Sequence, residues 1–321
     1  MGLKLKSPVI MASGPLTSSL DSLKKGEDAG AGAVVLKSIF EEQIEKDAGR
    51  DTQSSVDYLQ SSDHMEYFEA MAKDYYVDRY MSLLEKAKES LDIPVIASIN
   101  CKSISTWLDY ADRFRSCKAD AIELNYFPIA SNAEISGDKV DKALFDFVKS
   151  ARSRIGGRLS IKIGSFYSSL SNVIRRIDEA GLEGIVLFNR PFRPDIDLER
   201  LEIKSSSPLS SPNEYGMSLR WTALMSGEIK ADIAANTGIH DKNALIKMLL
   251  AGAKAVEICS AIMEKGYGVI TEMNSGLSSF MEEKGYGRLK DFIGLLAEEN
   301  YERGDAWERV QFLRTIGPVT E

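Results

Sequence analysis

Four segments of the chain repeat one pattern: a helix end, one or more small residues, a short apolar run and a polar residue. The segments are EDAGAGAVVLKS (27–38), SCKADAIELN (116–125), DEAGLEGIVLFN (178–189) and LLAGAKAVEICS (249–260). A glycine or another small residue lets the chain turn where a helix ends, and valine and isoleucine favour a buried strand. The repeat therefore predicts parallel strands that are entered from helices and that end in polar side chains.

Four further segments have the same apolar character and fit between these strands: SPVIMAS (7–13), DIPVIASIN (92–100), GRLSIKIG (157–164) and KADIAANTG (230–238). Apolar residues at three- and four-residue spacing predict helices over 105–116, 141–155, 168–181 and 241–252. Asp241 is placed to start the last of these helices. Eight alternating strand–helix units indicate an α/β fold of the (β/α)8 type, a TIM barrel.

An open, doubly wound sheet is the main alternative fold. That fold usually carries a G-x-G-x-x-G motif after its first strand, and this sequence has none there. We therefore expect a single barrel domain over residues 1–321, with insertions at about 39–90 and 189–220 and a C-terminal extension at about 298–321. Both insertions follow strand C-termini, where barrel enzymes build their sites, so each is expected to act as a lid or a binding loop.

Composition excludes several classes of protein. Hydrophobic residues make up 44% and charged residues 27%, as in ordinary globular proteins, and the net charge of −8 argues against a nucleic-acid binder. The three cysteines are far apart, and with only two histidines no metal site is expected. No apolar run approaches the roughly 20 residues of a membrane helix, and the N-terminus lacks a signal peptide. We expect a cytoplasmic protein that does not bind membranes and acts on a small molecule.

Polar residues at the predicted strand ends point to a ligand. Lysines and asparagines gather there with few acids, which suits an anionic ligand rich in carbonyls and ring nitrogens. Thr237-Gly238 and Ser260 end the last two strands, where barrel proteins often bind phosphate. Structural alternatives exist for two of the residues: Lys162 could pair with Glu123 inside the barrel, and Asn100 could be only a turn residue.

Taken in order, these segments resemble the dihydroorotate dehydrogenase family, which contains the flavin enzymes of pyrimidine synthesis. The resemblance rests on MASGPL (11–16), GAGAVVLKS (30–38), PVIASIN (94–100), IELN (122–125), LSIKIG (159–164), NTGIHDKNALIKMLLAGAKAVEICSAI (236–262) and MEEKGYGRLKDFIG (281–294). It runs from about residue 3 to 297 with gaps at both insertions.

The resemblance implies a barrel that holds FMN, an oxidoreductase activity and a homodimer. The residues implied for FMN are Ala12, Ser13, Lys37, Ser38, Asn100, Asn125, Lys162, Gly216, Thr237, Gly238, Cys259 and Ser260. Among these, Lys162 would lie near the pyrimidine part of the flavin ring, where a cation stabilises reduced flavin. The family's glycine pairs in the phosphate loops are here Thr237-Gly238 and Cys259-Ser260, and a backbone cradle tolerates such changes.

The substrate half departs further from the family pattern. The family's Cys or Ser base falls on Pro128, and its second asparagine falls on Ala130. The catalytic candidates are therefore Lys37, Asn125 and Ser131, and the substrate-binding candidates are Asn189 and Asn132. Tyr126, or His64 from the first insertion, could replace the base instead.

The sequence leaves three functions open. The first is FMN-dependent oxidation of dihydroorotate to orotate, or of a related substrate. The second is a TIM-barrel lyase or isomerase of a phosphorylated substrate, with Lys37 or Lys162 as Schiff-base lysine or proton carrier. The third is a non-catalytic homologue that only binds flavin, which the missing base suggests.

Overall fold

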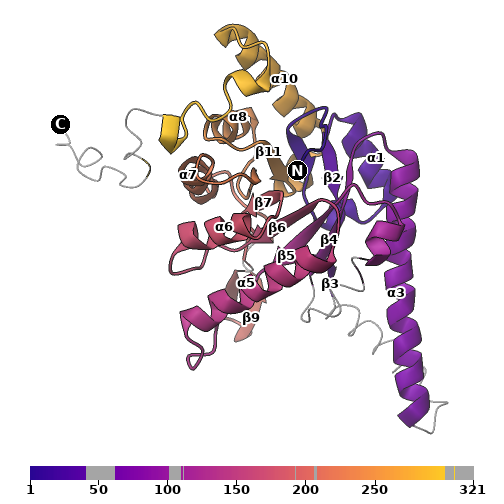
Figure 1. The fold of residues 1–321 in the computed structure, drawn as a ribbon. Helices are drawn as coiled ribbons and strands as arrows, with labels where there is room; N and C mark the ends of the chain where they lie inside the picture. Colours follow the sequence, from indigo (N-terminus) through magenta and orange to yellow (C-terminus); the bar gives the residue numbers. More distant parts are fainter. Residues whose placement is uncertain are drawn as a thin grey trace. The chain divides into compact units, whose positions relative to one another are not determined.

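The structure, a computed structural model, describes residues 1–40, 62–100, 110, 112–191, 193–205, 208–300 and 307, and of residues 62–74 and 205 it describes only the backbone. The chain divides into two compact units, Met1–Lys162 and Ile163–Glu321. Figure 1 shows the helices and strands of each.

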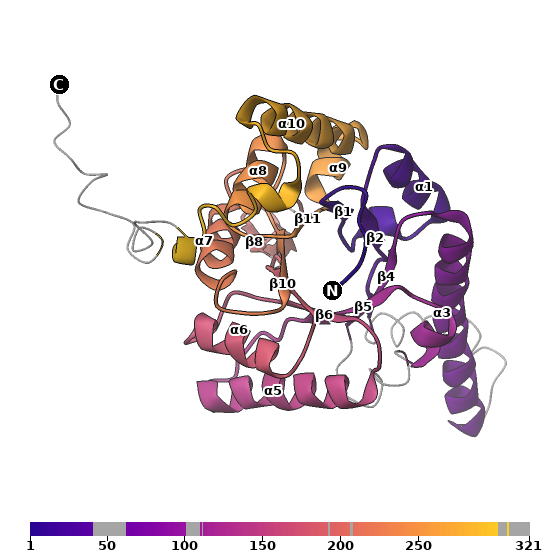
Figure 2. The same ribbon diagram turned by 45° about the horizontal axis from the view of Figure 1, so that its top comes forward.

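The first unit consists of parallel strands and the helices that follow them. Its elements are β1 (Val9–Met11), α1 (Leu20–Asp28), β2 (Ala33–Val35), β3 (Ile39–Phe40), α3 (Ser62–Ser90), β4 (Val95–Asn100), β5 (Ala121–Tyr126), α5 (Gly137–Arg154) and β6 (Leu159–Ile163), whose last residue belongs to the second unit. Parallel pairings join β1 to β2, β2 to β4 and β4 to β5, and β3 extends the sheet beside the end of β4. Helices α1 and α3 lie side by side against β2 and β4 (Figures 1 and 2).

The second unit continues the same alternation. Its elements are α6 (Leu170–Glu179), β7 (Gly184–Leu187), β8 (Pro194–Asp197), β9 (Glu202–Ser205), α7 (Gly216–Met225), β10 (Asp232–Asn236), α8 (Lys242–Leu250), β11 (Ala255–Ile258), α9 (Ser260–Lys265) and α10 (Gly268–Lys284). Strand β10 pairs in parallel with both β7 and β11, and β8 and β9 form a separate antiparallel hairpin. Helix α8 packs against β11 and lies next to α7 and α10 (Figure 2).

The predicted fold class is confirmed. Each of the eight predicted strands contains an observed strand, and strands alternate with helices along the described chain as in a (β/α)8 barrel. The strands β1, β2, β6, β7 and β11 are buried throughout, as expected of parallel strands covered on both faces. Asp241 caps α8 as predicted, since its side chain accepts the Ala244 N–H at 2.9 Å.

The insertions are more regular than the loop interpretation predicted. Residues 62–90 form the 29-residue helix α3. This stretch contains no glycine or proline, and Val77, Met81 and Leu84 recur at helical spacing and are buried. In the second insertion, Ile196 on β8 pairs with Ile203 on β9, and α7 begins at Gly216. The single-domain organisation stays a prediction. Within the described residues, no helix has the length and apolar character required to span a membrane.

A glycine fixes how closely β2 approaches the start of β1. The Gly32 N–H donates to the Val9 carbonyl at 2.7 Å. A Cβ built on Gly32 would lie 1.9 Å from the Ser7 carbonyl oxygen, which is a backbone atom and cannot rotate away. Only glycine therefore fits at this crossing without a shift of the backbone.

We predict that Gly32→Ala lowers the free energy of unfolding by about 1–3 kcal/mol, because overpacking forces such a shift. Gly268→Ala is the matched control, since a Cβ there meets nothing within 4 Å, and its effect should stay within about 0.5 kcal/mol. Urea denaturation of both variants measures the difference. Equal stability of the two variants would show that the crossing is not as tight as described.

Candidate functional site

A chain of serine hydroxyls joins the strand ends of the first unit. Ser38 Oγ lies 3.0 Å from Ser13 Oγ and 2.7 Å from Ser98 Oγ, and the Ser38 N–H donates to Ser13 Oγ at 2.8 Å. Asn125 Nδ2 also donates to Ser38 Oγ, at 3.4 Å. Three predicted site residues, Ser13, Ser38 and Asn125, therefore lie together, and Ser98 is a fourth member that sequence reasoning missed.

Ser98 has a signal in the sequence that could have revealed it. It is a polar residue inside the apolar run of β4, two positions before Asn100, and alternate strand residues share a face. Ser98 is paired in register with Glu123 of β5, so these two side chains also leave the sheet on one face. The buried face of β4 and β5 is thus polar along several residues.

The Tyr80 side chain of α3 makes two hydrogen bonds with the backbone of Ser98. The Tyr80 hydroxyl accepts the Ser98 N–H at 2.9 Å and lies 3.3 Å from the Ser98 carbonyl oxygen, to which it donates. Burial raises the pKa of Tyr80 far above its ordinary value; the hydrogen bond with Ser98 opposes this rise and the charge of Glu123 adds to it. Tyr80 therefore stays protonated and acts as a fixed hydrogen-bonding group.

The remaining candidates of the first unit lie at strand ends with differing exposure. Ala12 and Lys162 are buried, whereas Lys37 and Asn100 are half-buried. Burial removes a lysine from water, so a charge on its side chain is screened less than a charge at the surface. Of the two predicted cations, Lys162 is the one in such a position.

The segment after β5 carries the predicted base and substrate residues at the surface. Pro128, Ser131 and Asn132 are exposed, and Asn132 Oδ1 accepts the Glu134 N–H at 2.9 Å. No hydrogen bond in the described part of the chain joins Ser131 or Asn132 to the serine chain. Tyr126 stacks on Phe147 with 5.0 Å between ring centroids, and burial raises the pKa of Tyr126, which makes it a poor base. His64 lies in α3, and its side chain is outside the described residues.

In the second unit, the polar side chains at the end of β10 form hydrogen bonds with the backbone. Asn236 Nδ2 and Thr237 Oγ1 both donate to the Phe188 carbonyl, at 3.0 and 2.9 Å. Gly238 has φ +76°, and a Cβ there would lie 2.3 Å from the Tyr215 nitrogen, so glycine is required. Asn189 follows β7, and its N–H donates to the Ile163 carbonyl at 2.8 Å.

The candidates around β11 and α7 differ in their contacts. Cys259 Sγ lies 3.8 Å from Met263 Sδ, and Ser260 Oγ accepts the Ser210 N–H at 2.9 Å. Gly216 is the exposed first residue of α7. Ser210 was not predicted from the sequence, although it contacts two of the predicted phosphate residues.

An ion-pair cluster ties the end of β7 to the segment before α7. Glu214 Oε2 lies 3.0 Å from Arg190 Nε and 2.8 Å from a terminal guanidinium nitrogen of Arg193. The other carboxylate oxygen, Glu214 Oε1, accepts the Ser211 N–H at 2.8 Å. Burial raises the pKa of Glu214, but the hydrogen bonds from Arg190 and Ser211 and the charges of both arginines outweigh it. The pKa of this carboxyl therefore lies below its ordinary value of 4.5.

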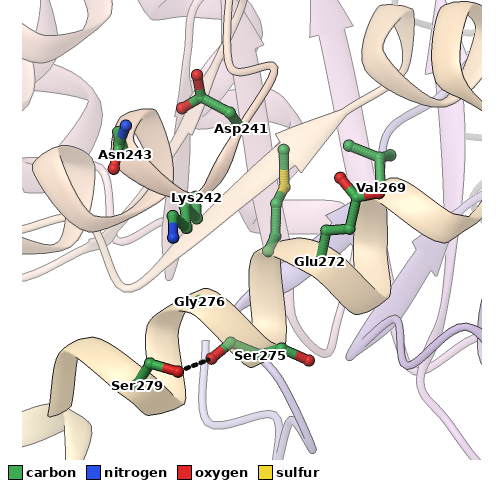
Figure 3. Close-up of a pocket in the computed structure, with 9 residues that line it drawn as sticks. Asp241, Lys242, Asn243, Val269, Glu272, Ser275, Gly276 and Ser279 are labelled. Carbon is green, nitrogen blue, oxygen red and sulfur yellow. Dashed lines mark hydrogen bonds between the residues drawn. The ribbon is translucent and has the colours of Figure 1, made fainter.

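An open groove of about 490 Å³ lies between the start of α8 and one face of α10 (Figure 3). Asp241, Lys242 and Asn243 line one wall, and Ser275, Gly276 and Ser279 line the other. The Lys242 side chain packs over Gly276, where a Cβ would lie 2.2 Å from Lys242 Cδ. None of the predicted site residues lines this groove, so it is not the candidate cofactor site.

The fold is that of a TIM-barrel protein with polar residues at its strand ends, and comparison with known proteins gives its family. Residues 1–281 match the family described as dihydroorotate dehydrogenase. This match covers most of the chain, so the protein belongs to the dihydroorotate dehydrogenase family.

Named relatives agree with that assignment. The catalytic subunit of dihydroorotate dehydrogenase B (NAD(+)) from Pyrococcus abyssi is 26% identical over 299 residues, which are 92% of this chain and 96% of that protein. The same subunit from Methanosarcina mazei is 27% identical over 322 residues, covering 92% of this chain and 94% of that protein. A crystal structure of the Eimeria tenella enzyme in complex with ferulenol matches with a TM-score of 0.66 at 18% identity, over 92% of this chain and 86% of that one. The last similarity supports the fold.

The Glu214 cluster predicts a pH dependence of stability. Because the folded-state pKa of Glu214 is lowered, its contribution to stability is present above the unfolded pKa and is lost as pH falls through the folded pKa. Glu214→Gln should therefore be less stable than wild type at pH 7, and the gap should close as pH falls below about 4.5. Urea midpoints over this pH range provide the measurement, with the exposed Glu228→Gln as control. A gap that does not change with pH would contradict this role.

Proposed function

We propose that the protein binds FMN and is an oxidoreductase that oxidises dihydroorotate or a closely related dihydropyrimidine. The observation that carries the proposal is the linked set of Ser13, Ser38, Ser98 and Asn125 at the strand ends of the first unit. Family membership supports the same reading.

The polar groups of the first unit fit a flavin ring. The ring edge presents carbonyl oxygens and ring nitrogens, and amide and hydroxyl side chains both donate and accept hydrogen bonds. Asn125 is oriented by its bond to Ser38, and Ser13 is held by two contacts with Ser38. A ligand would therefore meet groups that are already positioned, so little ordering is needed on binding.

One feature of the second unit suits phosphate binding, and another does not. Gly238 has φ +76° and no side chain, so its backbone can lie close to that of Tyr215, as phosphate-binding turns require. However, the Gly238 N–H already donates a hydrogen bond to Ser210 Oγ at 3.3 Å and is therefore not available to a phosphate. We therefore propose that phosphate is held by neighbouring amides and by the Ser260 hydroxyl, rather than by the Gly238 amide.

Lys162 is the residue proposed to tune the cofactor. The chemistry that FMN supplies when bound is hydride acceptance. Lys162 would hold a positive charge, shielded from water, beside the pyrimidine part of the ring, where negative charge gathers on reduction.

Proton removal from the substrate is the weak part of the site. Pro128 stands where the family has its base, and Tyr126 is disfavoured by its raised pKa. Ser131 is the candidate that the chain offers nearby, and it would need movement of the exposed segment after β5. General-base catalysis contributes typically 10²–10⁴-fold, so we expect slow turnover of dihydroorotate.

The test is the absorbance of the FMN-loaded protein before and after anaerobic addition of dihydroorotate. Bleaching of the oxidised flavin is the expected result. A protein that binds FMN but is not bleached would contradict the substrate and favour the non-catalytic flavin binder. A protein that takes up no FMN would contradict the cofactor, and activity on a sugar phosphate would then favour the lyase or isomerase.

We predict that Lys162→Ala weakens FMN binding or slows flavin reduction, because it removes the buried cation. Lys162→Met keeps the volume of the side chain and controls for packing, and it should show the same loss. Flavin content after dialysis and the rate of anaerobic reduction are the readouts. Wild-type values in both variants would show that Lys162 does not lie beside the ring.

A further inference from the structure

The second unit contains a buried polar pair, His240 and Ser210, that the proposed chemistry does not use. His240 is 1% exposed and Ser210 is 5% exposed. Ser210 Oγ lies 3.1 Å from His240 Nε2, and the Gly238 N–H donates to the same oxygen at 3.3 Å. His240 stands outside the regular elements, between β10 and the cap of α8.

Ser210 Oγ accepts the Gly238 N–H and also forms a hydrogen bond with His240 Nε2, in which the imidazole tautomer decides which group donates. His240 Nδ1 is buried and lies 3.3 Å from Glu264 Oε2 without forming a hydrogen bond. The Lys265 ammonium donates to the His240 carbonyl at 2.8 Å and fixes its backbone.

A serine, a histidine and a glutamate at these distances resemble the acyl-transfer triad, but the surroundings exclude that role. A nucleophilic serine must reach a carbonyl carbon of the substrate. Ser210 is almost fully covered, and its oxygen already accepts a backbone N–H. The pair therefore holds structure in place and does not attack a substrate.

Ser210 connects two strand ends to the segment before α7. Its N–H donates to Ser260 Oγ directly after β11, and its hydroxyl meets Gly238 directly after β10. Gly238 in turn abuts the Tyr215 nitrogen, where a Cβ would lie only 2.3 Å away. Ser210 is thus hydrogen-bonded to the glycine that lies against the residue preceding α7, which starts at Gly216.

We propose that His240 is a positioning residue for the phosphate end of FMN. It holds Ser210, and Ser210 holds the amides at the start of α7 and the Ser260 hydroxyl in the arrangement that receives the phosphate. His240 does not itself contact the ligand. This inference rests on the proposed function, because it needs FMN to bind.

Riboflavin provides the comparison that separates positioning from general stability, because it shares the flavin ring with FMN but lacks the phosphate. The experiment measures the dissociation constants of FMN and riboflavin for the full-length protein by quenching of flavin fluorescence. The variants are Ser210→Ala, which removes one hydroxyl, and His240→Leu, which removes both ring nitrogens. His240→Gln restores a polar group near Nε2 and tests for rescue.

The expected result is a roughly 10- to 100-fold weaker FMN affinity in Ser210→Ala and His240→Leu, by analogy with the loss of an outer hydrogen-bonding partner of a metal ligand. Riboflavin affinity should stay unchanged, and His240→Gln should recover part of the FMN affinity. Ser226→Ala is the matched control, because it also removes a hydrogen-bonded hydroxyl, one that donates to the Ala251 carbonyl at 3.0 Å, and it should change neither affinity.

Equal weakening of FMN and riboflavin, or no weakening of either, would overturn the positioning role while leaving the proposed function intact. Wild-type protein that binds neither flavin would overturn both proposals. If His240→Leu does not fold, Ser210→Ala decides the question, because it deletes a single oxygen.

Discussion

Ser38 Oγ lies within hydrogen-bonding distance of Ser13 Oγ, Ser98 Oγ and Asn125 Nδ2. A serine hydroxyl donates one hydrogen bond and accepts two, so these three neighbours use its whole capacity. The polar ends of the strands in the first unit are therefore set relative to one another by a single buried oxygen. In the proposed flavin site, Ser38 would act mainly through the residues that it orients, above all Asn125 and Ser13.

The second unit achieves a similar effect with Ser210, which joins the ends of β10 and β11 through its N–H and its hydroxyl. In each unit, a serine at or beside a strand end satisfies buried polar groups that would otherwise cost free energy. The predicted ligand residues are thereby preorganised, while the segment around Pro128 and Ser131 is exposed and has no such support. This contrast is consistent with a site that binds its cofactor better than it removes a proton.

The sequence predicted the eight strands, the barrel class and the α8 cap, because buried parallel strands and capped helices have local signatures. It did not predict α3, since a long insertion at a strand end was interpreted as a loop although residues 62–90 lack glycine and proline. Ser98 could have been found from its place two residues before Asn100. Ser210 and His240 could not have been paired from the sequence, because 30 positions separate them and only the fold brings them to 3.1 Å.

If the serine-linked strand ends of the first unit form a flavin site, the affinity for FMN should depend on the Ser38 hydroxyl, and measuring FMN binding by Ser38→Ala tests this. Removing this hydroxyl leaves buried partners unsatisfied, at a cost of about 1–3 kcal/mol, which corresponds to a roughly 5- to 150-fold loss of affinity if those partners meet the ligand. We predict that wild-type protein quenches FMN fluorescence on binding and that Ser38→Ala binds FMN more weakly within this range. Equal affinity of the two proteins, or no binding by wild type, would contradict this prediction.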